Sequence, residues 1–337
     1  MSTQKRHHYL SEFYLKEFSE KNRIWVYDRE TKKLRRDTAK NTAVKTNYYT
    51  ITDEYGKRST EAESNLARIE NIAVSLIKKL DQGENIAFSE KQELALFIAF
   101  LRTRVPHFEK VLSHMFDVHA KTSLRVASAT DERVDHLVDK YNLELNDFDS
   151  EDFREYVESD QYQVVPNHGL VIAYMFKMAL EIAKYLFQMD WFILHLNDDQ
   201  SLITTDVPFI ILAQKNQHPP YPYGIGLIVP GAVKLIPLTK KTALAMVNHG
   251  NKLEHRDFNS EQVSKLNEIM ALSSERLLIG PEQELIRGII EQTRLFDKEP
   301  NDYVKVSSFG DSFQGFITAT TLNVDAYNSS WLGNLIE

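Results

Sequence analysis

The chain has 337 residues, of which 42% are hydrophobic and 26% charged, as in ordinary soluble globular proteins with a large core. Its net charge of −8 excludes a protein that binds polyanions over its whole surface. The absence of cysteine excludes disulfides, thiolate metal sites and cysteine nucleophiles, so a metal would need His, Asp or Glu ligands. Neither a secretory signal nor a membrane-spanning stretch is expected, because no apolar run has the necessary position or length. We therefore expect a cytoplasmic location.

Charge is unevenly distributed along the chain. Residues 29–58 hold nine Lys/Arg against four Asp/Glu, whereas residues 131–160 hold twelve acids against three bases. The basic segment could meet the phosphates of a nucleic acid or a nucleotide. The alternative is a solvated hairpin with no partner.

The segment His7–Phe18 is the richest in aromatic rings and imidazoles. Soluble chains usually begin with dispensable polar residues, so a segment of this composition must pack against something. We predict that it belongs to the fold and to a site. Ser11 is the expected N-cap of a short helix, whose buried stripe includes Tyr14.

A small β unit is predicted next. Ile24–Asp28 is rich in β-branched and aromatic residues, and Leu34–Arg36 is its return strand after a turn. Tyr48–Thr52 is predicted as a third strand.

Two long helices follow. Apolar residues recur every three or four positions over 60–80, and Gly83 lies just beyond. Ser89 and Gln92 have the spacing of a capping box that opens a second helix. Pro106 is expected to kink or divide that helix.

The acidic stretch 129–160 resembles a surface insertion with short helical pieces, and a third helix is predicted over 170–188. Trp191–Leu196 is predicted as a strand that forms a hairpin with Ser201–Thr205. Residues 214–233 are predicted as a long loop.

The remaining elements alternate less regularly. Strands are predicted over 234–237 and 243–248, helices over 261–278 and 282–295, and strand and loop beyond Asp297. Because strands and helices come in blocks, the expected class is α+β. It comprises a small N-terminal β unit, long antiparallel helices, and a mixed antiparallel sheet with C-terminal helices.

The predicted organisation has four parts. Residues 1–58 form the His/aromatic segment and β-hairpin unit, and 59–128 the paired helices. Residues 129–165 form the acidic insertion, and 166–337 an α+β core that makes one globular unit with 1–128.

Several motifs together resemble a bacterial family of unknown function, number 4238, over roughly residues 7–280. The resemblance lies in these segments, in chain order: His8-Tyr9 with Phe13–Leu15 and Phe18, Leu66–Glu70, Phe97–Pro106, Ser201–Pro208, Lys234–Thr239 and Leu266-Asn267. Some members of that family are associated with anti-phage defence. The resemblance therefore implies a defence role.

His8 is the first candidate for chemistry, because imidazole titrates near neutral pH and can act as an acid, a base or a ligand. The alternative is a histidine that only forms hydrogen bonds at a helix start. Glu70 lies at the edge of an apolar stripe, where partial desolvation raises a carboxyl pKa. It could equally form a boundary salt bridge.

Arg104 falls within the apolar stripe of the second helix and needs a partner. It could pair with Glu70 across the helix interface, or hold a phosphate with two N–H groups. Asp206 follows a strand, with Thr205 beside it and Pro208 keeping Val207 extended. It is either a site carboxylate or a turn residue that caps its own backbone. His195 shares a strand face with Trp191 and points either to the core or to a cleft.

Familiar catalytic signatures are absent from the sequence. It has no phosphate-binding Gly-Lys-Ser/Thr loop, no HExxH helix and no Gly-x-Ser-x-Gly elbow. His114 and His119 have a poor spacing for binding one metal.

Three interpretations remain. The first is a defence nuclease, a hydrolase in which His8, Glu70, Arg104 and Asp206 are catalytic. In it the substrate contacts come from His7, Tyr9, Tyr14, Thr205 and Asn267. In it Glu70 and Asp206 either orient His8 or hold Mg²⁺ or Mn²⁺ as a cofactor. It also allows a homo-oligomer. The second is a non-catalytic binding or sensing module, and the third a buried polar network that only holds the N-terminus.

Overall fold

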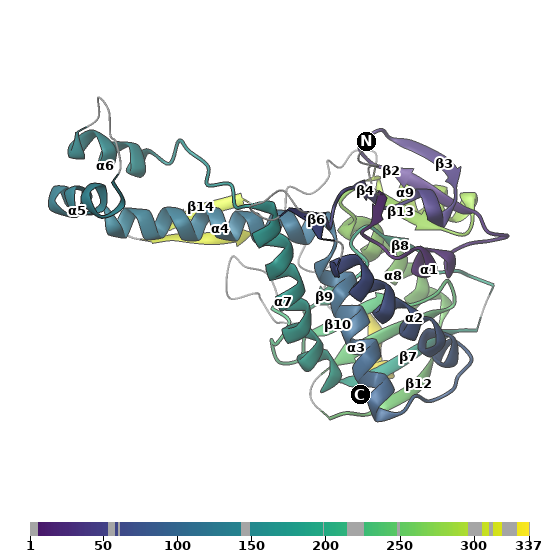
Figure 1. Cartoon of the computed structure of the whole chain (residues 1–337). Coiled ribbons are helices and arrows are strands. Elements are labelled where there is room, and N and C mark those ends of the chain that lie inside the picture. Colours follow the sequence, from purple (N-terminus) through teal and green to yellow (C-terminus); the bar gives the residue numbers. More distant parts are fainter. Residues whose placement is uncertain are drawn as a thin grey trace.

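The structure is a computed structural model that describes residues 6–52, 58–59, 61–142, 149–197, 199–213, 226–247, 250–295, 305–309, 313–318 and 329–336. The helices are α1 Glu12–Lys16, α2 Glu61–Asp81, α3 Phe88–Thr103, α4 Pro106–Ala127, α5 Asp131–Tyr141, α6 Ser150–Ser159, α7 His168–Phe187, α8 Ser260–Ser273 and α9 Gln283–Thr293, with 3₁₀ helices η1 Ala39–Asn41 and η4 Ser330–Ile336. The strands are β1 Arg6–His8, β2 Ile24–Asp28, β3 Lys33–Asp37, β4 Val44–Thr46, β5 Ile51–Thr52, β6 Arg58–Ser59, β7 Asp190–Leu196, β8 Thr204–Thr205, β9 Ile210–Leu212, β10 Val233–Pro237, β11 Thr242–Val247, β12 Leu253–Phe258, β13 Leu277–Gly280, β14 Lys305–Phe309 and β15 Phe313–Thr318. The predicted α+β class is confirmed (Figure 1).

The larger sheet has the strand order β12-β7-β11-β10-β9. Its neighbours are antiparallel except β12, which runs parallel to β7. The side chains of β10 and β11 are buried throughout, as expected for strands covered on both faces. Helices α2, α3 and α7 lie side by side next to this sheet (Figure 1).

The second sheet joins distant parts of the chain. Its order is β3-β2-β13-β8, so the predicted hairpin β2–β3 is present and is extended by strands that come much later in the sequence. Helices α8 and α9 contact it. The N-terminal hairpin therefore shares its sheet with the C-terminal half of the chain.

The hairpin predicted between 191–196 and 201–205 is wrong. Strand β7 pairs with β11 and β12, whereas β8 pairs with β13 in the other sheet. The connecting residues have other partners, since the Leu202 N–H donates to the Lys240 carbonyl and the Ile203 N–H to the Asn267 side chain. Tertiary pairing outweighs the local turn signal.

Three boundaries also differ from the sequence expectation. The second helix begins at Phe88, and the Glu90 carboxylate accepts a bond from the Ala87 N–H at 2.8 Å, so the predicted box at Ser89 is wrong. Residues 48–50 lie in a turn, and only 51–52 form a strand. The helix predicted to 278 ends at Ser273, because the buried run 277–280 enters the second sheet as β13.

The breaks read from proline and glycine are confirmed. Pro106 is the first residue of α4, where its missing N–H has no helical partner to lose. Gly83 follows α2 with φ +78°. Helix α4 extends away from the two larger sheets and carries α5 and α6 at its far end (Figure 1), in the region predicted as an acidic insertion. No helix in the described part of the chain has both the length and the hydropathy of a membrane span.

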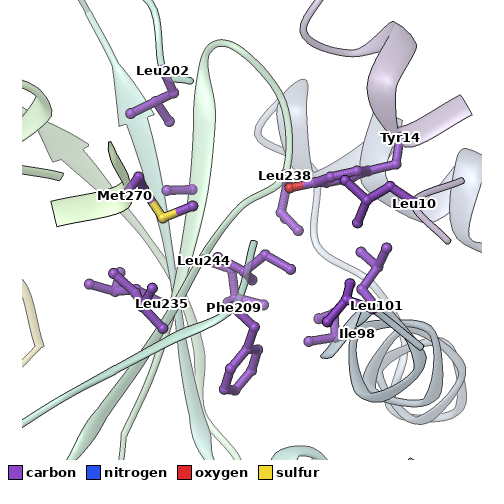
Figure 2. Packing of buried hydrophobic residues seen from close by; sticks show 14 of the residues in the cluster. Leu10, Tyr14, Ile98, Leu101, Leu202, Phe209, Leu235, Leu238, Leu244 and Met270 are labelled. Carbon is purple, nitrogen blue, oxygen red and sulfur yellow. The ribbon is translucent and has the colours of Figure 1, made fainter. Parts of the chain in front are cut away.

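The N-terminal segment is part of the hydrophobic core. Leu10, Tyr14, Leu15 and Phe18 have no exposed surface. Figure 2 shows Leu10 and Tyr14 beside Leu101 of α3 and Leu238 at the end of β10. Burying these side chains stabilises the fold by roughly 1.5–3 kcal/mol each, which explains why the segment is fixed.

Candidate functional site

The segment that contains β1 and α1 is held by hydrogen bonds at both elements. Strand β1 pairs with β4, and the Ser11 hydroxyl accepts a bond from the Tyr14 N–H at 3.4 Å, as predicted for an N-cap. The Tyr14 hydroxyl donates to the Pro237 carbonyl and lies 2.8 Å from the Thr204 hydroxyl. These bonds fix the position of the two histidines that precede the helix.

His7 and His8 point to opposite sides of β1. His7 is buried, stacks on the Tyr49 ring, and accepts a bond from the Tyr49 N–H at Nδ1. His8 is half-buried, and its Nε2 lies 3.1 Å from the Lys40 carbonyl. A carbonyl only accepts, so Nε2 carries the proton and Nδ1 of the neutral ring carries the lone pair. Burial lowers the pKa of His8, which favours this neutral form.

Arg104 and Glu70 form the pair that the sequence suggested. Arg104 follows α3 directly, immediately before the break at Pro106, and its side chain is only 2% exposed. Its Nη1 donates to Glu70 Oε1 of α2 at 2.5 Å, while Glu70 keeps part of its surface in solvent. Among the described residues, Arg104 Nε and Nη2 have no hydrogen-bond partner although both atoms are buried. A buried guanidinium with two unused donors is costly unless a ligand binds them.

Tyr49 connects the segment of His8 with the pair of Arg104 and Glu70. Its hydroxyl lies 3.4 Å from the His8 carbonyl and 3.5 Å from the Arg104 carbonyl, so it can donate to either. The Glu70 charge also reaches His8, whose pKa it raises slightly against the effect of burial. We call His8, Tyr49, Glu70 and Arg104 the arginine cluster. Sequence analysis missed Tyr49, because it assigned residues 48–52 to a strand rather than to a turn that can face inward.

Asp206 lies elsewhere in the bonding network. Its two carboxyl oxygens accept bonds from the N–H groups of Glu275 and Arg276, at 3.1 and 2.8 Å, in the turn before β13. It therefore caps a distant turn rather than its own backbone. Burial, reinforced by the charge of Glu275, raises the pKa of Asp206 to about 7.

Tyr9 follows His8 in the chain and lies within reach of the charge of Asp206. Its phenol is buried, and the charges of Asp206 and Glu275 add to the effect of burial in raising its pKa. Within the described part of the chain, no hydrogen bond or ion pair joins Asp206 to the arginine cluster. The structure thus joins two of the four predicted catalytic residues, Glu70 and Arg104, by an ion pair, and it connects His8 to them through its backbone and Tyr49.

Thr205 and Asn267 have structural contacts. The Asn267 side chain accepts from the Ile203 N–H and donates to the Ser201 carbonyl, both at 2.9 Å, so it acts like a piece of neighbouring strand. The Thr205 hydroxyl accepts from the Val207 N–H. With Tyr14, these residues hold β8 and the preceding residues 201–203 in place.

His195 and His255 form a second pair of imidazoles, of which the sequence analysis singled out only His195. His195 Nε2 and His255 Nδ1 lie 2.7 Å apart across the parallel strands β7 and β12, and the rings stack. Burial lowers the pKa of both. His195 is half-buried, which agrees with neither a fully buried nor an open position. His255 was missed because the charged run 254–257 has no strand pattern.

The basic segment 29–58 is partly used inside the fold. Arg29 is buried and donates to the Ser274 carbonyl. Arg35 pairs with Asp28 and Asp37, and Lys45 with Glu109. Lys57 and the side chain of Arg58 lie outside the described residues. The positive charge available to a nucleic acid is thus smaller than the sequence count implied.

Metal ligands do not gather in the described residues. There, no group of three or more His, Asp or Glu side chains has a geometry that could hold a metal ion. Glu70 and Asp206, the carboxylates expected to bind Mg²⁺ or Mn²⁺, are engaged by a guanidinium and by two backbone N–H groups respectively.

The fold and the arginine cluster define an α+β protein whose N-terminus is built into a buried polar site. The chain matches the family described as Protein of unknown function (DUF4238) over residues 6–284, and it belongs to that family. No match is found among curated proteins or among solved structures.

Proposed function

We propose that this protein is a hydrolase that cleaves phosphodiesters, a nuclease of the anti-phage type, with its active site at the arginine cluster. One observation carries the proposal: Arg104 is buried and has two N–H groups without a partner among the described residues. Its ion-pair partner Glu70 also acts on the half-buried His8, whose pKa it raises against the effect of burial. Two donors of one planar guanidinium match two oxygens of a phosphate. Glu70, on Nη1, fixes the orientation of the guanidinium.

His8 supplies the proton chemistry in this proposal. Its Nε2 is engaged by the Lys40 carbonyl, so Nδ1 is the atom that takes a proton from an attacking water. The new P–O bond forms as the bond to the leaving oxygen breaks, and the imidazolium returns the proton to that oxygen. Arg104 stabilises the charge that builds up on the phosphate.

Asp206 has a positioning role in the proposal. Its bonds to the turn at 275–276 hold β8 and β13 together. The Asp206 charge acts on Tyr9, which follows the two histidines in the chain. Cleavage of phage nucleic acid would take place in the cytoplasm. The exposed Lys and Arg side chains of segment 29–58 would attract the polyanion. The proposal allows a divalent ion as cofactor and a homo-oligomer as the active form, and the assay should vary the metal ion.

Purified protein should be incubated with single- and double-stranded DNA and RNA and with bis(p-nitrophenyl) phosphate, in EDTA, Mg²⁺ or Mn²⁺. We expect His8→Ala to reduce cleavage at least 100-fold, in line with the loss of a general base. His136→Ala, which alters an exposed histidine of α5, is the control and should cleave normally. Intact substrates under all conditions would refute the proposal.

A binding or sensing module is the second candidate. It is favoured by Glu70 and Asp206, which are both occupied by protein groups rather than presented to a ligand. In that case the wild-type protein binds phosphate esters without turnover. His8→Ala would then protect bacteria from phage as well as the wild type does in a plaque assay, whereas Arg104 variants would not.

A further inference from the structure

A cavity of about 420 Å³ opens between helices α2, α3 and α7, within the range of roughly 300–1,000 Å³ typical of small-molecule sites. Each helix contributes one stripe of side chains with a spacing of three or four residues. The lining residues are Asn65, Arg68, Ile69 and Ile72 of α2, Glu93, Leu96 and Phe100 of α3, and Phe176 and Leu180 of α7.

The cavity borders the arginine cluster along two helices. Ile69 directly precedes Glu70, and Phe100 lies one helical turn before Arg104, whose N–H donates to the Phe100 carbonyl. Phe176 packs edge-on against both Phe100 and Tyr49, with ring centroids 5.1 and 6.3 Å apart. The cavity wall therefore packs against Tyr49 of the arginine cluster and lies one helical turn from Arg104, which is not itself a lining residue.

The chemistry of the walls suits a planar heteroaromatic ring. Two phenylalanines and the aliphatic side chains cover its faces, and base–aromatic contacts are worth roughly 1–3 kcal/mol per base. Asn65, Arg68 and Glu93 are exposed at the rim and offer an amide, a guanidinium and a carboxylate to the polar edge of the ring.

We infer that this cavity receives the base of a nucleoside phosphate whose phosphate is bound by Arg104. The inference rests on the proposed function and adds the substrate class to it. A base can enter a chamber between helices only when it is unpaired, so the substrate is a nucleotide within a single strand or a free nucleotide whose phosphate is a diester.

Leu180 provides the test, because it lines the cavity, is 50% exposed, and belongs to no part of the arginine cluster. Leu180→Glu places a charge on the apolar wall, and Leu180→Trp fills the space. Leu170→Glu is the matched control, since Leu170 is 45% exposed on the same helix and does not line the cavity. Thermal melting establishes that each variant is folded.

Affinities should be measured by calorimetry for four nucleoside 5′-monophosphates and for ribose 5-phosphate, which has no base. In the wild type we expect the best nucleotide to bind at least tenfold more tightly than ribose 5-phosphate. Both Leu180 variants should lose about tenfold in nucleotide affinity and keep their affinity for ribose 5-phosphate. Leu170→Glu should change neither.

Equal affinities for the two kinds of ligand would overturn the base pocket, and so would Leu180 variants that bind nucleotides normally. The proposed hydrolase would survive both results if phosphodiesters are still cleaved. If neither ligand binds and nothing is cleaved, the phosphate site at Arg104 is wrong as well.

A separate competition experiment distinguishes a free nucleotide from a nucleotide within a strand. Single-stranded oligonucleotides and the matching duplexes should be compared as competitors of the bound mononucleotide. Competition by single strands alone identifies a nucleotide within a strand, and competition by neither identifies a free nucleotide. Equal competition by single strands and duplexes would contradict the need for an unpaired base.

Discussion

The arginine cluster and the surroundings of Asp206 are both buried and polar, but they differ in how their hydrogen bonds are used. Asp206 and Asn267 direct their polar atoms at backbone groups of neighbouring segments. The Arg104 guanidinium has one partner, and its other two nitrogen atoms have none among the described residues. Saturated polar groups stabilise a fold, whereas a buried donor without a partner costs free energy that a ligand can recover.

The largest expected effect concerns the charge of Asp206. Its folded-state pKa of about 7 lies above the usual 3.8, so the folded protein binds the proton more tightly than the unfolded chain. Stability should therefore fall as pH rises from 4 to 7, by up to roughly 4 kcal/mol from this group.

Asp206→Asn removes that slope. Chemical denaturation of both proteins at pH 4 to 8 measures it, with the exposed Asp139→Asn as a control that retains the wild-type slope. If the unfolding free energy of wild type and of Asp206→Asn depends on pH in the same way, the carboxyl of Asp206 is not held protonated. The two regions would then differ only in their hydrogen bonds and not in their electrostatics.

Asn267→Ala should destabilise the protein by about 3 kcal/mol, because the Ile203 N–H and the Ser201 carbonyl both lose their buried partner. Denaturant unfolding measures the loss, and Glu261→Gln on the exposed first turn of the same helix is the control. Phosphate-ester binding by the folded fraction should be unchanged. A selective loss of binding would place Asn267 in the site after all.

Arg104→Lys should reduce phosphodiester cleavage about 100-fold, equivalent to about 2.7 kcal/mol, since lysine keeps the charge but loses the planar pair of donors. Its unfolding free energy should change less than that of Asn267→Ala, because the ion pair to Glu70 can persist. Initial rates and denaturation curves of the same samples give both numbers. Unchanged rates with a large loss of stability would reduce the arginine cluster to a structural network.

Local signals predicted much of the fold. Apolar periodicity located α2, and proline placed the break between α3 and α4, because these features act within a few residues along the chain. The helices predicted over 170–188 and 282–295 are present as α7 and α9. Strand partners were harder. The apparent hairpin at 191–205 is divided between two sheets, since the N–H and carbonyl groups of 201–203 bind residues far away in sequence.

The candidate site shows the same division. Composition marked His8, Glu70 and Arg104 as unusual for their positions, and the sequence suggested the pairing of Glu70 with Arg104. Tyr49 and His255 gave no signal, because their importance depends on a turn and on a parallel strand that no local pattern announced.

By itself, the sequence determined that this is an α+β chain with a ring-rich N-terminus fixed in the core, because side-chain volume and hydropathy are properties of the residues. Only the tertiary structure decided which polar groups have partners. Asp206 found two backbone donors and Arg104 kept two unused ones, and such pairing depends on segments up to 70 residues apart meeting at hydrogen-bonding distance.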